Sequence, residues 1–179
     1  FDENISGWDL SNVTTMQSMF RNASSFNQSI GNWNTSLVTN LRGMFEGATD
    51  FNQCIRDWNT SLVTRFDGMF ESASSFNQDI GDWDTSNATH MNNMFSGTAG
   101  LSDANKCLIH VSFQSNDAWP YDWSDLCESA GYTYVPDDNF EQALIDLGYD
   151  DTLENYVVTD SISGVTELDV RNDSISDLT

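Results

Sequence analysis

The side chains that most often perform catalysis are few in this sequence, and they are not arranged in a catalytic motif. The two histidines are His90 and His110, and no serine or cysteine stands beside either one in a hydrolase signature. There is no glycine-rich phosphate loop, and the three cysteines and two histidines lack the spacing of a zinc site. We therefore expect no enzyme activity.

Carboxylates dominate the charged side chains, with 28 acidic and 6 basic residues and a net charge of -22. This balance argues against nucleic acids and against anionic membrane surfaces as partners, because both are bound by Lys and Arg. No apolar run is long enough to cross a membrane, so we expect no direct membrane insertion. We predict no cofactor. The carboxylates lack the spacing of the twelve-residue calcium loop, and calcium held by exposed aspartates stays open as an alternative.

The first hundred residues consist of four copies of a 25-residue unit, without insertion or deletion. Residues that occupy the same position in the four copies form what we call a column. The apolar columns are Phe1, Phe26, Phe51 and Phe76; Ile5, Ile30, Ile55 and Ile80; Trp8, Trp33, Trp58 and Trp83; and Met19-Phe20, Met44-Phe45, Met69-Phe70 and Met94-Phe95. A fixed period of this length is typical of stacked units and predicts a solenoid with these columns in its core.

The pattern within one copy predicts a short strand followed by a short helix. Residues 30–35 alternate as a strand does, and Ser36 stands where a helix N-cap is expected. Residues 38–45 then place their apolar side chains on one helical face. The predicted fold class is therefore an α/β solenoid of short parallel strands and short helices.

The residues on either side of each tryptophan are the candidate binding residues. In a strand they point away from the core, and most of them are Asn or Asp. Parallel stacking would then cover one exposed surface with amide and carboxylate groups, which we call the Asn/Asp face. Its residues are Asp9, Asn32, Asn34, Asp57, Asn59, Asp82 and Asp84.

The repeat unit resembles the BspA-like family of bacterial leucine-rich-repeat surface proteins. The stretch from Ile80 to Phe95, IGDWDTSNATHMNNMF, carries the motif, with Ala88 in place of the usual Val. The resemblance covers residues 1–100 and continues as far as residue 130. It implies a leucine-rich-repeat-like right-handed coil that is exposed on the cell or secreted. It also implies a role in adhesion or partner recognition, and no enzyme.

Residues 1–100 are therefore assigned to the four repeats, and residues 101–132 resemble the segment that ends such arrays. We predict that this second segment is a cap. In an exported protein its cysteines, Cys107 and Cys127, would form a disulfide, which leaves Cys54 as a single thiol.

Residues 133–179 are predicted to begin a second leucine-rich-repeat array. A helix is expected to start at Pro136-Asp137-Asp138, with Asp137 or Asp138 as its N-cap. Its apolar face would consist of Phe140, Ala143, Leu144 and Leu147. Its sequence, VPDDNFEQALIDLGYD, resembles the helical N-cap of such arrays. Residues 165–178 look like an internalin-type first repeat.

These observations favour an extracellular or cell-surface recognition module that binds an unidentified protein or glycan through its repeats. Two alternatives stay open. One is a spacer that binds nothing, and the other is a carbohydrate-binding module of a secreted enzyme that uses Trp119 or Trp123. Because the chain starts inside one repeat and stops inside another motif, we interpret it as a monomeric fragment of a longer chain.

Overall fold

The computed structural model describes residues 4–135, 138–150 and 156–163. Contacts divide the chain into two compact units, Phe1–Asp122 and Trp123–Thr179. The first unit contains the repeats and helix α1 (Asp103–Phe113). The elements of the second unit are α2 (Ser124–Ser129), β1 (Tyr132–Tyr134), α3 (Asp138–Asp146), β2 (Tyr156–Val158) and α4 (Thr159–Ile162). None of the helices in the described part combines the length and the apolar character needed to cross a bilayer.

The repeats contain neither a helix nor a strand within residues 4–100. Neighbouring repeats are joined by parallel bridges of single residues, from Thr15 to Asn40, Asn40 to Arg65 and Arg65 to His90. The one sheet found among the described residues has two antiparallel strands, β1 and β2. The predicted α/β solenoid, a leucine-rich-repeat-like coil of short parallel strands and short helices, is therefore wrong.

The helix predicted over residues 38–45 does not form because its backbone donors are used between repeats. The N–H groups of Leu41 and Gly43 donate to the carbonyl oxygens of Arg65 and Asp67 at 2.9 and 2.8 Å. Gly43 also has a φ of 57°, in the left-handed region, which a right-handed helix cannot contain. The other members of its column have the same conformation; they are Ser18, Gly68 and Asn93.

The strand predicted over residues 30–35 is replaced by two consecutive turns. The N–H of Trp33 donates back to the carbonyl oxygen of Ile30 at 3.2 Å, which closes the first turn. The N–H of Ser36 then donates to Oδ1 of Asn34 at 3.1 Å. These groups bond within their own repeat, so they are not available to a ladder between strands.

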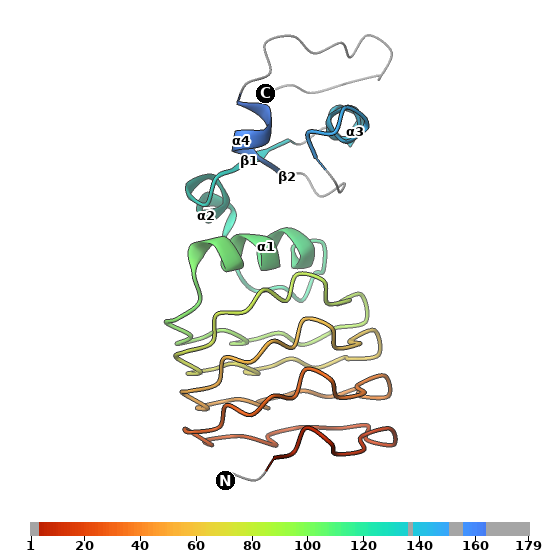
Figure 1. The fold of residues 1–179 in the computed structure, drawn as a ribbon, viewed down its shortest axis with the longest axis vertical. Coiled ribbons are helices and arrows are strands. Elements are labelled where there is room, and N and C mark those ends of the chain that lie inside the picture. Colours follow the sequence, from red (N-terminus) through yellow and green to blue (C-terminus); the bar gives the residue numbers. More distant parts are fainter. Residues whose placement is uncertain (1–3, 136–137, 151–155, 164–179) are drawn as a thin grey trace. The chain divides into compact units, whose positions relative to one another are not determined.

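Equivalent side chains of successive repeats nevertheless lie on top of one another, and the repeats form a regular stack in the first unit (Figure 1). The rings of Trp33, Trp58 and Trp83 have centroids 6.4 and 6.2 Å apart and planes within 7° of parallel. Phe51 and Phe76 stack at 6.0 Å and 3°. The core of this unit is therefore a set of apolar columns, and each repeat is stabilised mainly by its neighbours.

Hydrogen bonds between repeats run beside the apolar columns. Each buried indole donates its N–H, at 3.1 Å, to the carbonyl oxygen of the isoleucine in the preceding repeat. The pairs are Trp33 with Ile5, Trp58 with Ile30 and Trp83 with Ile55. Oδ1 of Asn52 accepts from the backbone N–H of Asn77 at 2.9 Å and from the Gln78 amide at 2.7 Å. Repeated Trp and Asn side chains therefore fix the register of the stack.

Helix α1 covers the last repeat within the first unit (Figure 1). Its N-cap is Ser102, whose hydroxyl accepts from the N–H of Asn105 at 3.3 Å. Its buried face includes Ile109 and Phe113. The predicted disulfide between Cys107 and Cys127 is confirmed, whereas Cys54 is a free and exposed thiol.

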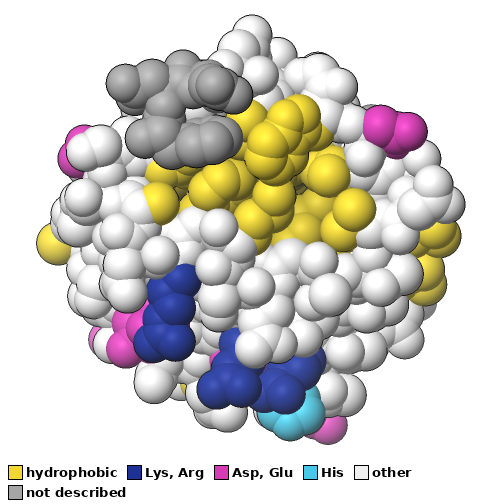
Figure 2. Space-filling view, turned by 90° about the horizontal axis from the view of Figure 1, so that it is seen from below, with side chains coloured by type: hydrophobic (Ala, Val, Ile, Leu, Met, Phe, Trp, Pro, Cys, Tyr) yellow, Lys and Arg dark blue, Asp and Glu magenta, His cyan; other side chains and the backbone are white. Residues whose placement is uncertain are grey.

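The first repeat leaves apolar side chains exposed at the other end of the stack. Figure 2 shows hydrophobic side chains gathered over this end of the molecule. Trp8 is 47% exposed, whereas Trp33, its equivalent in the second repeat, is 4% exposed. Met19 is 37% exposed and Met44 is fully buried. Each later repeat thus depends on the preceding one to cover this apolar edge.

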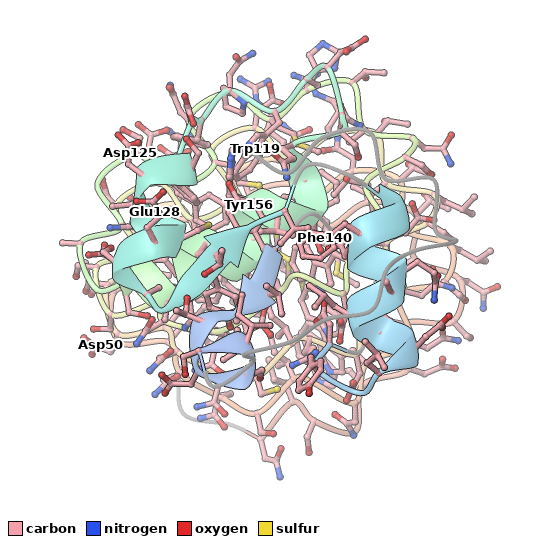
Figure 3. The ribbon with its side chains drawn as sticks, turned by 90° about the horizontal axis from the view of Figure 1, so that it is seen from above. Asp50, Trp119, Asp125, Glu128, Phe140 and Tyr156 are labelled. Carbon is pink, nitrogen blue, oxygen red and sulfur yellow. The ribbon has the colours of Figure 1, made fainter. Side chains whose placement is uncertain are left out.

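The second unit has a small core between its helix α3 and its sheet. Val135, Leu144 and Val157 form the buried cluster, and Phe140 projects from α3 on the side of β2 (Figure 3). The predicted helix is confirmed over Asp138–Asp146, although Leu147, expected on its apolar face, is 53% exposed. The predicted leucine-rich repeat over residues 165–178 lies outside the described residues.

Candidate functional site

The residues that directly follow each tryptophan on the Asn/Asp face are part of local turns. In every copy the side-chain Oδ1 accepts the backbone N–H of the serine two residues later, at 2.9 to 3.1 Å. The residues concerned are Asp9, Asn34, Asn59 and Asp84. One oxygen of each side chain therefore holds the backbone, and the remaining polar atoms lie at the surface.

The residues that precede each tryptophan differ from one another in their contacts. The Asn32 amide donates to the carbonyl oxygen of Ser6 at 3.2 Å, and Asp82 forms an ion pair with Arg56. Asp57 is exposed and makes no hydrogen bond or ion pair within the described part of the chain. The structure thus places all seven predicted residues at the surface, with Asp57 the least engaged, and their role in binding stays a prediction.

Hydrogen bonds keep several carboxyls of this face ionised. The backbone and the hydroxyl of Ser11 hold the pKa of Asp9 below its ordinary value. The hydroxyl and the backbone N–H of Ser86 act in the same way on the pKa of Asp84, and the Arg56 guanidinium lowers the pKa of Asp82. The face is therefore acidic at neutral pH.

A cleft of about 840 Å³ lies beside the last repeat, and we call it the cap cleft. It is bordered by the fourth repeat on one side and by α1 and the segment after α1 on the other. Eight of its eleven lining residues carry a hydroxyl, carboxylate or amide group. The lining residues are Trp83, Asp84, Thr85, Ser86, Ala88, Thr89, Ser112, Ser115, Asn116, Asp117 and Ala118.

The cap cleft exists because the cap occupies only part of the space that a further repeat would fill. The hydroxyl of Thr60 donates to the carbonyl oxygen of Asp84, one repeat later, at 3.0 Å. Thr85 holds the same position in the last repeat, and its hydroxyl makes no hydrogen bond within the residues described. The Asn116 amide instead bonds the carbonyl oxygens of Thr85 and Ala88, at 2.6 and 3.1 Å. Asn116 therefore closes the backbone at this end and leaves the Thr85 hydroxyl facing the cleft.

A second hollow, of about 400 Å³, crosses all four repeats, and we call it the four-repeat groove. The groove runs along the column of residues with left-handed φ values, Ser18, Gly43, Gly68 and Asn93. The residue before each of these lines one side of the groove, and the residue three positions after it lines the other side in the first three repeats. The lining residues are Gln17, Ser18, Arg21, Arg42, Gly43, Glu46, Asp67, Gly68, Glu71, Asn92 and Asn93. Unlike the cap cleft, it contains charges of both signs.

The cap aromatics are engaged in packing. Trp119 makes edge-to-face contacts with Phe113 and Tyr121, at 5.3 and 5.1 Å between ring centroids. Its indole N–H donates to Nδ1 of His110 at 3.2 Å, and the Tyr121 hydroxyl accepts the N–H of Phe95 at 2.9 Å. Figure 3 shows Trp119 within this side-chain cluster. Trp119 is thus half-buried and packs at the end of the core, and sugar binding through it stays an untested alternative.

No group of three or more His, Cys, Asp or Glu side chains within the described ranges could hold a metal ion. The exposed His90 and the buried His110 belong to different sites, the fourth repeat and the cap. The Thr89 hydroxyl lies 2.8 Å from Nδ1 of His90, at an exposed position of the fourth repeat.

Both hollows are lined in part by residues that were not predicted from the sequence to bind a ligand. The cap cleft depends on Ser115 and Asn116, which lie outside the repeats and have no counterpart in them. The groove depends on columns that change from copy to copy, such as Gln17, Arg42, Asp67 and Asn92. This variation between copies was the sequence feature that could have indicated the groove, because residues that vary within an otherwise constant repeat are not needed for stacking.

A comparison with known protein families gives a match that covers the repeats. A model of the family described as "Mycoplasma protein of unknown function, DUF285" matches residues 1–106, which is more than half of the chain. No curated protein and no solved structure matches the chain. The match supports a bacterial repeat family and carries neither the BspA-like nor the leucine-rich-repeat name. The chain belongs to the DUF285 family.

Proposed function

We propose that this chain is an extracellular or cell-surface recognition module that binds a glycan or protein partner through its repeat surface. The cap cleft is the observation that carries the proposal. At about 840 Å³ it is within the usual size range of ligand sites. Its hydroxyl, amide and carboxylate groups match the hydrogen-bonding groups of a sugar or of a polar protein loop.

The Asn/Asp face borders the cap cleft and extends the same kind of surface. Asp84 belongs to both, and its carboxyl accepts the N–H of Ser86, which also lines the cleft. A partner seated in the cleft can therefore also contact Asp82 in the same repeat and Asp57 in the preceding one. The resemblance of the repeat unit to BspA-like surface proteins supports the same role.

An oxidising environment outside the cytoplasm is supported by the disulfide between Cys107 and Cys127. The net charge of -22 suits a soluble surface that repels nucleic acid and anionic lipid. The proposed partners are therefore neutral or cationic glycans and proteins.

The proposal is tested by binding the chain to a glycan array and to an array of extracellular proteins, with two kinds of variant. Ser115→Trp places an indole in the cap cleft, and Ser25→Trp adds the same group at an exposed position of the first repeat. Asp57→Ala combined with Asp82→Ala removes charge from the Asn/Asp face. We expect the wild type and Ser25→Trp to share a ligand that Ser115→Trp loses and that the double variant binds more weakly.

The spacer hypothesis predicts no ligand on either array. A ligand lost only on substitution of Trp123 would support the carbohydrate-binding module instead, provided that this variant keeps the unfolding temperature of the wild type. A ligand that every variant binds equally well would contradict the proposed site.

A further inference from the structure

We propose that the four-repeat groove binds an extended peptide segment of a partner protein, one that carries an acidic and a basic side chain. This site lies in other columns than the cap cleft and does not depend on the function proposed above. The floor of the groove is backbone, and its two walls are side chains. One wall contains a positive charge and the other a negative charge, and neither charge is in an ion pair within the described residues.

The floor is the column of left-handed residues. Ser18, Gly43, Gly68 and Asn93 have φ values between 56 and 58°. The N–H groups of Gly43 and Gly68 donate to carbonyl oxygens of the next repeat, and their own carbonyl oxygens accept the N–H groups of Glu46 and Glu71. The floor is therefore satisfied and rigid, so recognition falls to the side chains of the walls.

Arg42 supplies the positive charge of one wall. The neighbouring arginines are paired, since Arg21 bonds Glu46 at 2.5 Å and Arg65 bonds Asp67 at 3.0 Å. The exposed side chain of Arg42 makes neither an ion pair nor a hydrogen bond within the described residues. In a chain with 28 acidic and 6 basic residues, an arginine that lacks a carboxylate partner is unexpected. Its planar fork of N–H donors suits a carboxylate of a ligand.

Glu71 supplies the negative charge of the other wall, in the next repeat. Its Oε2 lies over the floor, 3.1 Å from the position that a Cβ on Gly68 would take. Glu46 lies over Gly43 in the same way, but Arg21 neutralises it. Glu71 has no ion pair within the described residues, so its carboxylate is available to an ammonium or guanidinium group.

The two charges are in adjacent repeats on opposite walls, and no ion pair joins them. In the end-on view of Figure 2, Lys and Arg side chains gather along one part of the rim, apart from the hydrophobic patch. Repeats joined by parallel bridges are separated by about 4.8 Å, so four repeats extend over about 15 Å, the length of four or five extended residues. A peptide segment therefore fits the groove better than a free amino acid does.

The direct test is fluorescence anisotropy with labelled eight-residue peptides at low ionic strength. One set carries a Glu and a Lys in both orders, separated by one to four residues. Control peptides carry only the Glu, only the Lys, or neither charge. We expect the doubly charged peptides to bind best, at one preferred spacing and order, and to weaken as salt is added.

Two variants test which side chain of the groove contacts which charge of the peptide. Arg42→Gln should weaken the best peptide about tenfold and remove the preference for Glu while keeping that for Lys. Glu71→Gln should do the reverse. Arg56→Gln and Asp57→Asn remove the same charges at residues that do not line the groove, and they should leave the affinity unchanged. Ser115→Trp should also leave it unchanged, which separates this site from the cap cleft.

Three results would overturn the proposal. They are the absence of binding by every peptide, equal binding of the charged and neutral peptides, and equal affinities for the wild type, Arg42→Gln and Glu71→Gln. Unfolding temperatures of the variants, measured alongside, show that each retains the fold.

Discussion

The indole N–H of Trp58 donates to the carbonyl oxygen of Ile30, 28 residues earlier in the chain, at 3.1 Å. Trp58 is 3% exposed and Ile30 is fully buried, so no water replaces this bond when it is lost. The pair joins two repeats through a side chain and a backbone group, and it recurs at both neighbouring interfaces.

Replacement of Trp58 by Phe keeps an aromatic ring in the column but removes one of the two hydrogen bonds that the Ile30 carbonyl oxygen accepts, the other coming from the Trp33 N–H. We expect a loss of about 0.5–1.5 kcal/mol in the free energy of unfolding, the usual net contribution of one hydrogen bond. Urea unfolding followed by circular dichroism measures it. Trp8→Phe, at the exposed end of the same column, should cost clearly less, and equal losses would contradict this role of the indole.

Gly47 is expected to tolerate no larger side chain. Its φ is 69°, and a Cβ would lie 2.6 Å from Oδ1 of Asn22 in the preceding repeat. Gly47→Ala should therefore lower the free energy of unfolding by about 1–2 kcal/mol. Gly7 has nothing within 4 Å of the same position, so Gly7→Ala is the matched control. Thermal unfolding of both variants tests the expectation, which fails if they are equally stable.

Reduction of the disulfide should destabilise the cap. The bond between Cys107 and Cys127 closes a loop whose opening costs about 3 kcal/mol in the chain-entropy account. Urea unfolding with and without a reducing agent should show this difference. Cys54→Ser should be as sensitive to the reducing agent as the wild type, and an unaffected wild type would mean that the cap is held by packing alone.

His110 should make the stability of the cap depend on pH. Its Nδ1 accepts the Trp119 indole N–H, which requires an unprotonated nitrogen. Burial lowers the pKa of His110 in the folded state below its ordinary value of 6.5, while Asp122, with Oδ1 3.9 Å from Nε2, opposes this shift. The unfolded chain therefore binds the proton more readily. Stability is fully present above pH 6.5 and is lost as the pH falls toward the folded-state pKa.

The measurement is the free energy of unfolding between pH 7.5 and pH 5. His110→Gln should remove the decline over this range, whereas His90→Gln, at an exposed site, should retain it. Carboxyls with lowered pKa values, such as Asp84, lose their contribution only at lower pH, below their ordinary value of 3.8. A decline of the same size in His110→Gln would assign it to other groups.

The sequence was sufficient to predict which residues stack. Trp33, Trp58 and Trp83 recur at one spacing, and a column of large apolar side chains is stable only when it is covered by its neighbours. A ladder of Asn side chains runs beside these columns, and in it Oδ1 of Asn27 accepts the Asn52 N–H at 2.9 Å.

The local backbone conformation that the sequence predicted for the repeats was wrong. Apolar residues between 38 and 45 fall on a helical face, but the same spacing arises when every second N–H of a turn bonds the next repeat. Gly43 and Gly68, in the middle of the predicted helices, were the sign of a left-handed conformation. The cap cleft could not be predicted, because it depends on how Asn116 meets Thr85, 31 residues earlier.

The most direct test of the proposed function is backbone amide NMR of the chain during titration with its strongest array ligand. A recognition site in the cap cleft predicts that the largest shift changes occur at Thr85, Ser86, Thr89 and Asn116, and that they disappear in Ser115→Trp but persist in Ser25→Trp. Shift changes confined to residues away from the cleft, or none at saturating ligand, would contradict the account.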